Sequence, residues 1–556
     1  MSSNKKNKNR ALQVATVLAS TGFGKNAAGL KDIIQGDNAL WDAMKNVPGP
    51  KGRTPLMYAA DTGDMARVRF LLARGANPNL KTSTGKTALM FASEMGHDDI
   101  VRELCSKGHP EDAHPHPMAN VNDKDFIGMT ALMSACMGCH IDTVTVLLNL
   151  GADVHLTATE GSNALMFAAS VGEPCKAVIR KLLDSGININ ARDKAGKTAL
   201  FKRTEECFGR TPPDLMRLLI DLGADVNITT NSGETPLMQA CRHNTIEAAT
   251  LLCDNGANLD AVELGLGTTA LMYATIKNSK ECLQLLCDRG ADKELQTISG
   301  STAINLTVWN GSIDCLRILA EAGANLDVEN NSGATPLMNA AAGNLLEMFG
   351  APPSHRDIGT GTGTECLRIL CEYGANVDQS GLGGTTAAIL AAETGSAEKL
   401  EILKDHGANL NLGDDDNRTP LYVAVAEKNK ECVTLLCKLG VQMDIPATID
   451  TGEELANPPQ YTPLMLAAEE GDFDLVKILC SYGAHGGWEN PDGDSALTLA
   501  KTDEIRKYIE HDIKSPAGKL LSYLPLSRFG GGKRRTRRCR RRHQREYSKK
   551  RKTRAH

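Results

Sequence analysis

Residues 52–64 read GRTPLMYAADTGD, and residues 233–244 read GETPLMQACRHN. The triplet Thr-Pro/Ala-Leu that both share recurs along the chain, and the first residue of each copy serves as an anchor. The strict copies begin at Thr54, Thr87, Thr130, Thr198, Thr235, Thr269, Thr335, Thr419 and Thr462, and the looser ones at Asn163, Thr302, Thr386 and Ser495. Six intervals between successive anchors are 33 residues long, and the others exceed 33 by insertions. A period of this length predicts a repeat protein rather than one compact core.

Each part of the repeat has a physical reason. A Thr side chain caps a helix by accepting a backbone N–H, and Pro suits the first helical turn. A small pair such as Ala59-Ala60 lets neighbouring helices approach, and a pair such as Leu71-Leu72 fills the layer between repeats. A Gly such as Gly75 supplies the left-handed end of the second helix, and one such as Gly52 allows a tight hairpin turn. The unit is therefore two helices followed by a hairpin.

These residues resemble the ankyrin-repeat family over about residues 54–512. The resemblance implies an all-α fold, an ankyrin-repeat solenoid of helix-turn-helix units with β-hairpin loops. One departure is systematic, because Met stands where the family has His after Thr-Pro-Leu, as at Met57, Met90 and Met338. That His makes hydrogen bonds between repeats in the family, so we expect thioether packing to replace them here.

The expected organisation has four parts. Residues 1–50 form a disordered start and N-terminal capping helices, although the basic start before ALQVATVLAS also resembles a signal or transit peptide. Residues 51–514 form an array of 13 repeats, residues 515–529 a linker, and residues 530–556 a basic disordered tail. Long insertions are expected near residues 109–119, 344–361 and 446–459.

Charge divides the chain. Residues 11–529 carry 44 basic and 66 acidic residues, a balance of about −22, whereas the tail carries 14 Lys/Arg and one acid, Glu546. The acidic body favours a basic partner. No apolar run is long enough to cross a bilayer, so we expect no membrane partner.

Several motifs suggest chemistry. Twelve of the 16 cysteines recur at packing positions of the repeat, which predicts buried free thiols in a reducing, intracellular compartment, the cytoplasm or the nucleus. The string CMGCH at residues 136–140 resembles a haem attachment site, but the repeat register accounts for its residues. HPEDAHPHP at 109–117 is a zinc-site candidate or an extended loop, and we favour the loop. GTGTGT at 359–364 lacks the lysine of a phosphate-binding loop.

We find no cluster of nucleophile, base and orienting group, and we expect neither catalysis nor a cofactor. In the ankyrin family, partners contact the hairpin tips and the exposed end of the first helix. Trp309 is the notable candidate there, because Trp is enriched at binding hot spots; burial against the next repeat is the alternative. The full set of candidates is Trp309, Glu94, Glu205, Glu206, Arg242, His243, Lys277, Glu393, Glu427, Glu469 and Glu470 on the helix face, with Phe126 and Ile127 at a hairpin tip.

The sequence thus predicts a non-enzymatic protein–protein interaction scaffold or adaptor. The alternative is a nucleic-acid-associated factor whose tail binds DNA or RNA while the repeats recruit proteins. The tail could equally direct nuclear import or dock on the acidic repeats, and it resembles basic tails of proteins from large DNA viruses of protists. Its candidate residues are Lys533, Arg534, Arg535, Arg537, Arg538, Arg540, Arg541, Arg542, Lys549, Lys550, Arg551 and Lys552.

Overall fold

The computed structural model describes residues 45–107, 117–206, 214–343, 360–448 and 458–514. The chain divides into two compact units, Met1–Lys277 and Asn278–His556, and each is treated by itself. The predicted start before residue 45, the linker and tail after residue 514 and most of the three long insertions lie outside the described residues.

Unit 1 is built from pairs of short helices. Its first helices, which follow the anchors, are α4 (Pro55–Thr62), α6 (Ala88–Glu94), α8 (Ala131–Met137), α10 (Ala164–Val171), α12 (Ala199–Glu206), α14 (Pro236–Arg242) and α16 (Ala270–Ile276). Its second helices are α5 (Met65–Ala73), α7 (Asp98–Cys105), α9 (Ile141–Asn149), α11 (Lys176–Asp184), α13 (Asp214–Asp221) and α15 (Ile246–Asp254), with the short 3₁₀ turns η1 (Pro50–Gly52) and η2 (Glu173–Cys175).

Unit 2 continues the same alternation. Its first helices are α18 (Ala303–Asn310), α20 (Pro336–Ala342), α22 (Ala387–Glu393), α24 (Pro420–Ala426) and α26 (Pro463–Glu470). Its second helices are α17 (Lys280–Asp288), α19 (Ile313–Glu321), α21 (Thr360–Glu372), α23 (Ala397–Asp405), α25 (Lys430–Lys438), α27 (Phe473–Ser481) and α28 (Asp503–Lys514), with the 3₁₀ turn η4 (Leu382–Gly384) and the two strands β1 (Ala447–Thr448) and β2 (Gln460–Tyr461).

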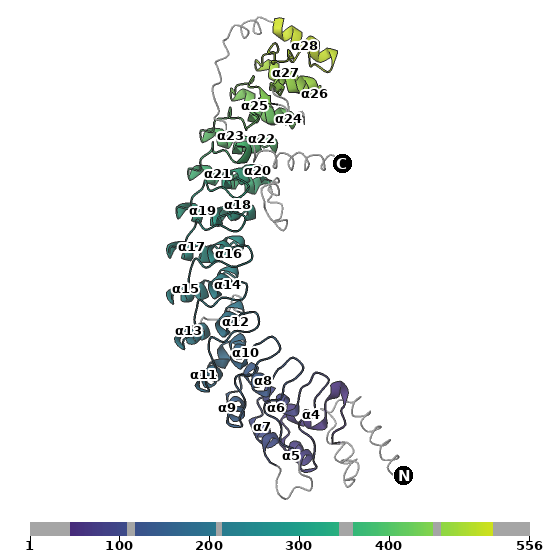
Figure 1. Cartoon of the computed structure of the whole chain (residues 1–556), viewed down its shortest axis with the longest axis vertical. Coiled ribbons are helices and arrows are strands. Elements are labelled where there is room, and N and C mark those ends of the chain that lie inside the picture. Colours follow the sequence, from purple (N-terminus) through teal and green to yellow (C-terminus); the bar gives the residue numbers. More distant parts are fainter. Residues whose placement is uncertain (1–44, 108–116, 207–213, 344–359, 449–457, 515–556) are drawn as a thin grey trace, which may run out of the picture. The chain divides into compact units, whose positions relative to one another are not determined.

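Within each unit, first helices pack on first helices and second helices pack on second helices. In unit 1, first helix packs on first helix from α4 to α16, and second helices α5, α7, α9 and α11 form a separate row (Figure 1). Unit 2 repeats the arrangement from α18 to α26 and from α17 to α28. The core between the rows consists of small and aliphatic side chains, among them Ala59, Leu71 and Leu132, which are almost fully buried. The all-α repeat fold predicted from the periodicity is confirmed.

The anchors start helices as predicted, with one exception. Thr54, Thr87 and Thr235 precede α4, α6 and α14, and each side chain accepts a hydrogen bond from the backbone N–H three residues on. Ser495 differs, because residues 496–498 form a turn and the next helix, α28, begins at Asp503. The last anchor thus opens a half-repeat, whose helix buries Ile505 and Ile509.

The methionines after the anchors do more than fill space. The Sδ atom of Met57 accepts a hydrogen bond from Thr54 N at 3.3 Å, and that of Met238 accepts one from Thr235 N at 3.4 Å. Each thioether thus completes a reciprocal capping box, a role that Glu or Gln usually takes. The side chains are buried, so the expected thioether packing is joined by a local polar contact.

The capping hydroxyl should contribute measurably to stability. Thr235→Ala removes the acceptor that Met238 N uses at 3.2 Å, and we expect the free energy of unfolding to fall by about 1 kcal/mol. Urea unfolding monitored by circular dichroism measures the change. Thr235→Ser keeps the hydroxyl and should retain most of the stability; an equal loss in both variants would assign the effect to the Thr methyl group instead.

Hydrogen-bonded turns, rather than long strands, form most of the described loops between repeats. In the turn before α6, Thr82 N donates to Lys86 O at 3.0 Å and Gly85 takes a positive φ of 86°. Regular strand pairing within the described residues is limited to β1 with β2 and two isolated bridges. Most of the GTGTGT run lies in α21, which begins at Thr360.

Candidate functional site

The hairpin before α8 projects two apolar side chains into solvent. Phe126 is 70% exposed and Ile127 is 64% exposed. Asp125, which is buried below them, accepts hydrogen bonds through Oδ1 from Ile127 N at 3.0 Å and from Met129 N at 2.8 Å. Phe126 N also donates to Thr84 O of the preceding hairpin at 3.1 Å. The tip is therefore held in shape by polar contacts while its apolar groups face outward.

A second tip in unit 1, before α16, has the same design. Leu264 and Leu266 are 73% and 69% exposed, and Leu264 N donates to Ser232 O of the preceding hairpin at 2.8 Å. The carboxylate of Glu263 accepts from Gly265 N at 2.6 Å and from Leu266 N at 2.5 Å. Burial disfavours the charged form of Glu263, but these amide donors outweigh it and lower its pKa. The tip stays organised wherever this carboxylate is ionised.

Sequence reasoning identified Phe126 and Ile127 as tip candidates but missed Leu264 and the buried acids. The signal was present, because a residue that accepts hydrogen bonds from the tip recurs five positions before several anchors, as at Asp125, Asp193 and Asp414. Large apolar residues one to three positions after such a residue would have marked the projecting tips.

The exposed end of the first helices carries ion pairs. In unit 1, Lys86 Nζ lies 2.7 Å from Glu94 Oε2, and Lys197 Nζ lies 2.7 Å from Glu205 Oε1. In a third pair, Arg242 at the helix end lies 3.3 Å from Glu234, so here the acidic residue precedes the anchor and the basic residue follows it. Every pair joins the residue just before an anchor to the residue eight positions later. The predicted acidic face is thus partly compensated from within the chain, which sequence position alone had not shown.

The remaining candidates on this face of unit 1 lie in different surroundings. Lys277 is exposed and His243 is half-buried. Burial, followed by the nearby Arg242 charge, lowers the pKa of the His243 imidazole. Glu206 ends α12, and its side chain lies outside the described set.

In unit 2, some of the acidic candidates have partners within the chain and others are described by their exposure alone. Glu470 pairs with Lys428 at 2.9 Å, and Glu469 accepts from the Tyr461 hydroxyl at 3.5 Å. Glu427 is exposed and Glu393 is half-buried. The structure places all four at or beside the ends of first helices, as the repeat register predicts.

The expectation for Trp309 is wrong. Its side chain is only 2% exposed at the end of α18, so it presents no ring to a partner. The corresponding positions Asp61 and Glu94 keep contact with solvent, whereas a large aromatic side chain gains more from removal of its surface from water. The alternative of burial is the one the structure supports, and replacing Trp309 by Ala should destabilise unit 2.

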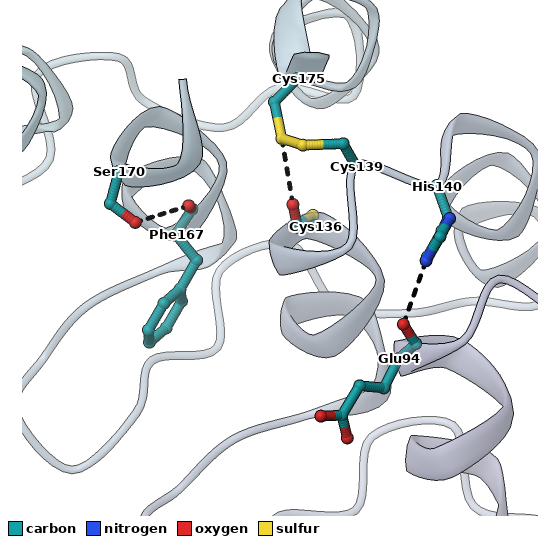
Figure 2. Close-up of a disulfide and its surroundings, with 7 residues drawn as sticks. All are labelled: Glu94, Cys136, Cys139, His140, Phe167, Ser170 and Cys175. Carbon is teal, nitrogen blue, oxygen red and sulfur yellow. Dashed lines mark hydrogen bonds between the residues drawn. A yellow bond between two sulfur atoms is a disulfide. The ribbon is translucent and has the colours of Figure 1, made fainter. Parts of the chain in front are cut away.

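The prediction of free thiols is confirmed for the twelve cysteines at recurring packing positions. Twelve of the described cysteines form no disulfide, and most are buried. Burial raises the pKa of Cys105 to about 11 and that of Cys480 to about 12, so these thiols are poor nucleophiles. Cys139 and Cys175, however, are joined by a disulfide (Figure 2).

The other chemical motifs are resolved as far as the described residues reach. Of the CMGCH string, Cys136 is fully buried, Cys139 is bound to Cys175, and His140 Nε2 lies 3.0 Å from Glu94 O. The repeat register accounts for the positions of all three residues, but it did not predict the disulfide of Cys139. HPEDAHPHP falls almost wholly outside the described residues, and no group of potential metal ligands occurs within them. None of the helices formed by the described ranges is long and apolar enough to span a bilayer.

Comparisons with known proteins agree with the repeat. A family model described as ankyrin repeats (3 copies) matches residues 17–115, 114–193, 207–297 and 359–447, and a single ankyrin-repeat model matches residues 460–486. Together these matches cover more than half of the chain.

Similar proteins share the repeat over limited stretches. The E3 ubiquitin-protein ligase KEG of Arabidopsis thaliana is 25% identical over 320 residues, which are 57% of this chain and 17% of that protein. Ankyrin repeat and SOCS box protein 11 of Homo sapiens is 34% identical over 110 residues, which are 20% of this chain and 31% of that protein. The chain spans less than a third of the length of these curated relatives.

Solved structures give short overlaps. The ankyrin repeat domain of Bcl-3 is 30% identical, with a TM-score of 0.35 over 38% of this chain and 94% of that one. The human ASB11 ankyrin repeat domain is 25% identical, with a TM-score of 0.34 over 45% of this chain and 100% of that one.

Proposed function

Because the chain belongs to the ankyrin-repeat family, we propose that it is a non-enzymatic scaffold or adaptor that binds proteins through its hairpin tips. The observation that carries the proposal is the tip geometry of unit 1. Phe126, Ile127, Leu264 and Leu266 are among the most exposed large apolar side chains of the described residues. The fold does not need them for packing, and rigid apolar groups held by a polar frame suit a protein surface.

The helix face beside the tips contributes polar contacts in this proposal. Its ion pairs keep partial contact with solvent, and surface pairs contribute only about 0–1 kcal/mol, so a partner's charges can replace them at little cost. A basic partner stays a prediction, and internal pairing of Glu94, Glu205 and Glu470 removes part of the negative charge that motivated it.

Serine substitutions at a tip test the proposal. The double variant Phe126→Ser with Ile127→Ser should weaken binding of a partner, recovered by proximity labelling of the full chain, by at least about ten-fold. Titration calorimetry with the purified partner measures the change. Leu150→Ser is the matched control, because Leu150 is an exposed apolar residue at the end of α9 rather than at a tip. Equal effects of the two changes would contradict a role for the tip.

The nucleic-acid alternative stays a prediction that depends on the tail. Removing residues 530–556 deletes 14 Lys/Arg and should abolish any salt-sensitive affinity for DNA or RNA, if the tail binds phosphates. Fluorescence anisotropy at low and high salt measures this affinity. A gain in partner binding at low salt after deletion would instead support docking of the tail on the acidic repeats.

A further inference from the structure

Two neighbouring repeats of unit 1 depart from the regular pattern in the loops between their helices. The loop between the two helices of a repeat holds Gly63 and Gly96 at positive φ in the first two repeats, but the corresponding residue of the third is Cys139, with a φ of 56°. The fourth repeat is also irregular, because 35 residues instead of 33 separate Asn163 from Thr198. Its extra residues form η2 (Glu173–Cys175) between α10 and α11. The third repeat thus gains a thiol in a strained position, and the fourth a turn that carries another.

These two irregularities bring the sulfur atoms of Cys139 and Cys175 together. Cys139 and Cys175 are bonded, with their Cα atoms 4.8 Å apart, within the range of roughly 4.4–6.8 Å that disulfides occupy. Figure 2 shows the bond joining the loop after Cys136 to the turn that holds Cys175. Cys175 is fully buried, whereas Cys139 keeps contact with solvent. An attacking reagent can therefore reach the pair from the side of Cys139.

The disulfide lies within a line of contacts between successive loops. On one side, His140 Nε2 lies 3.0 Å from Glu94 O at the end of α6. On the other, Glu173 Oε1 accepts a hydrogen bond from Leu215 N in the first turn of α13 at 2.8 Å. The covalent bond thus connects two noncovalent links that reach from the second to the fifth repeat. Its formation fixes the loops of these repeats against one another.

The pair is also chemically distinct from its neighbours. No other disulfide forms among the described cysteines, and buried thiols such as Cys105 and Cys136 have raised pKa values. An oxidant would therefore act selectively at Cys139 and Cys175, where a half-exposed cysteine lies next to a second one.

We propose that Cys139 and Cys175 form a reversible redox staple, closed by exchange with a low-molecular-weight disulfide and opened by the matching thiol. In closure, the Cys139 thiolate attacks one sulfur of the small disulfide and expels one thiolate. The Cys175 thiolate then attacks the Cys139 sulfur of the mixed disulfide and expels the second thiolate. Two cysteine thiols are oxidised to one disulfide, one small disulfide is reduced, and the two protons end on the released thiols.

Peptide mapping of the native full chain tests the staple directly. The reduced protein is treated with excess oxidised glutathione, alkylated at low pH, digested and analysed by mass spectrometry. We expect a linked peptide pair that contains Cys139 and Cys175, and its loss when reduced glutathione is added without denaturant. Full alkylation of both residues after oxidation would overturn the proposal, and so would a link that is reducible only in the unfolded chain.

Hydrogen exchange tests the mechanical consequence. Reduction should speed amide exchange in α9, α11 and the loops beside them by roughly 10- to 100-fold, because the open form gains chain freedom. In Cys139→Asn, exchange should match the reduced protein under both conditions; Asn244 and Asn278 show that Asn adopts this positive φ in other repeats. Cys287→Ser, which alters a half-buried thiol of α17 in unit 2, should keep the full response to redox. Unchanged exchange on reduction of the wild-type protein would refute the staple.

Discussion

Lys399→Met should raise the free energy of unfolding of unit 2 by about 3 kcal/mol at pH 7. Lys399 is only 4% exposed within α23, and burial lowers its pKa from 10.5 to about 8. A shift of one pKa unit corresponds to about 1.4 kcal/mol, so keeping this ammonium charged inside the fold is costly. Met has a similar length without the charge, and the corresponding side chains of other repeats are the buried Cys282, Cys315 and Cys432.

The surroundings of Lys399 show how the fold tolerates a buried charge. Its Nζ donates to Ala341 O, near the end of α20, at 3.0 Å. A side chain on Gly343 or Gly363 would come within about 3.5 Å of the same Nζ, so the two glycines leave room for the ammonium group. The Thr394 hydroxyl also donates a hydrogen bond to Ala341 O at 3.5 Å. In the Met variant, this hydroxyl can still serve as the hydrogen-bond donor to that carbonyl.

The lowered pKa of Lys399 determines how its contribution to the stability of unit 2 changes with pH. Between pH 8 and 10.5 the unfolded chain keeps the proton on Lys399 whereas the folded chain has lost it. The unfolded state therefore binds more protons, and this residue's contribution to stability rises with pH in that window. The advantage of the Met variant is complete below pH 8 and should vanish as pH approaches 10.5.

Denaturant unfolding of both proteins between pH 7 and 10.5 measures the difference. Comparing the variant with the wild type cancels the titration of other groups, including the buried thiols. Lys404→Met, an exposed change in the same helix, should have an effect within about 0.5 kcal/mol. A destabilised Lys399→Met variant would show that the hydrogen bond to Ala341 O outweighs desolvation of the ammonium.

Gly85→Ala should lower the free energy of unfolding of unit 1 by roughly 2–4 kcal/mol. Gly85 has a φ of 86°, which costs an L-residue about 1–2 kcal/mol. An added Cβ would also lie 2.6 Å from Phe126 N and 2.8 Å from the Phe126 ring, so the neighbouring hairpin must move. The same displacement should weaken partner binding, because Phe126 forms the projecting tip.

Gly151→Ala separates the two causes. Gly151 has a φ of 87°, but nothing lies within 4 Å of its added Cβ. This control should lose only the conformational part, about 1–2 kcal/mol, and should leave partner binding unchanged. Thermal and urea unfolding with a binding titration measure both quantities. Equal losses of stability in the two variants would show that the Phe126 hairpin moves away at no cost.

Residues that play the same role in every repeat could be predicted from the sequence. The period placed Thr54 and its counterparts before helices, because the same cap and core requirements recur in every unit. Positions where one repeat departs from the others were harder. The sequence marked Trp309 as solvent-facing by register, but exposure depends on the neighbouring repeat, and its ring is buried.

Contacts between different repeats were also beyond the sequence. The two extra residues before Thr198 were visible, yet only the folded chain shows that they bring Cys175 to Cys139. Lys399 stood at a position that Cys282 and Cys315 mark as buried, and this register could have identified its unusual environment. The ion pairs beside the tips share a spacing of eight residues, but only the folded chain shows that this spacing brings the two charged groups into contact.

Site-specific photo-crosslinking tests the central claim most directly, namely that the hairpin tips bind protein. A photoreactive phenylalanine analogue replaces Phe126 at the tip in one variant and Phe70, an exposed residue of α5, in the other. Both changes preserve an aromatic ring, so folding is matched. With the partner present, we predict adducts from position 126 and none from position 70. Adducts from position 70 alone would contradict binding through the tips.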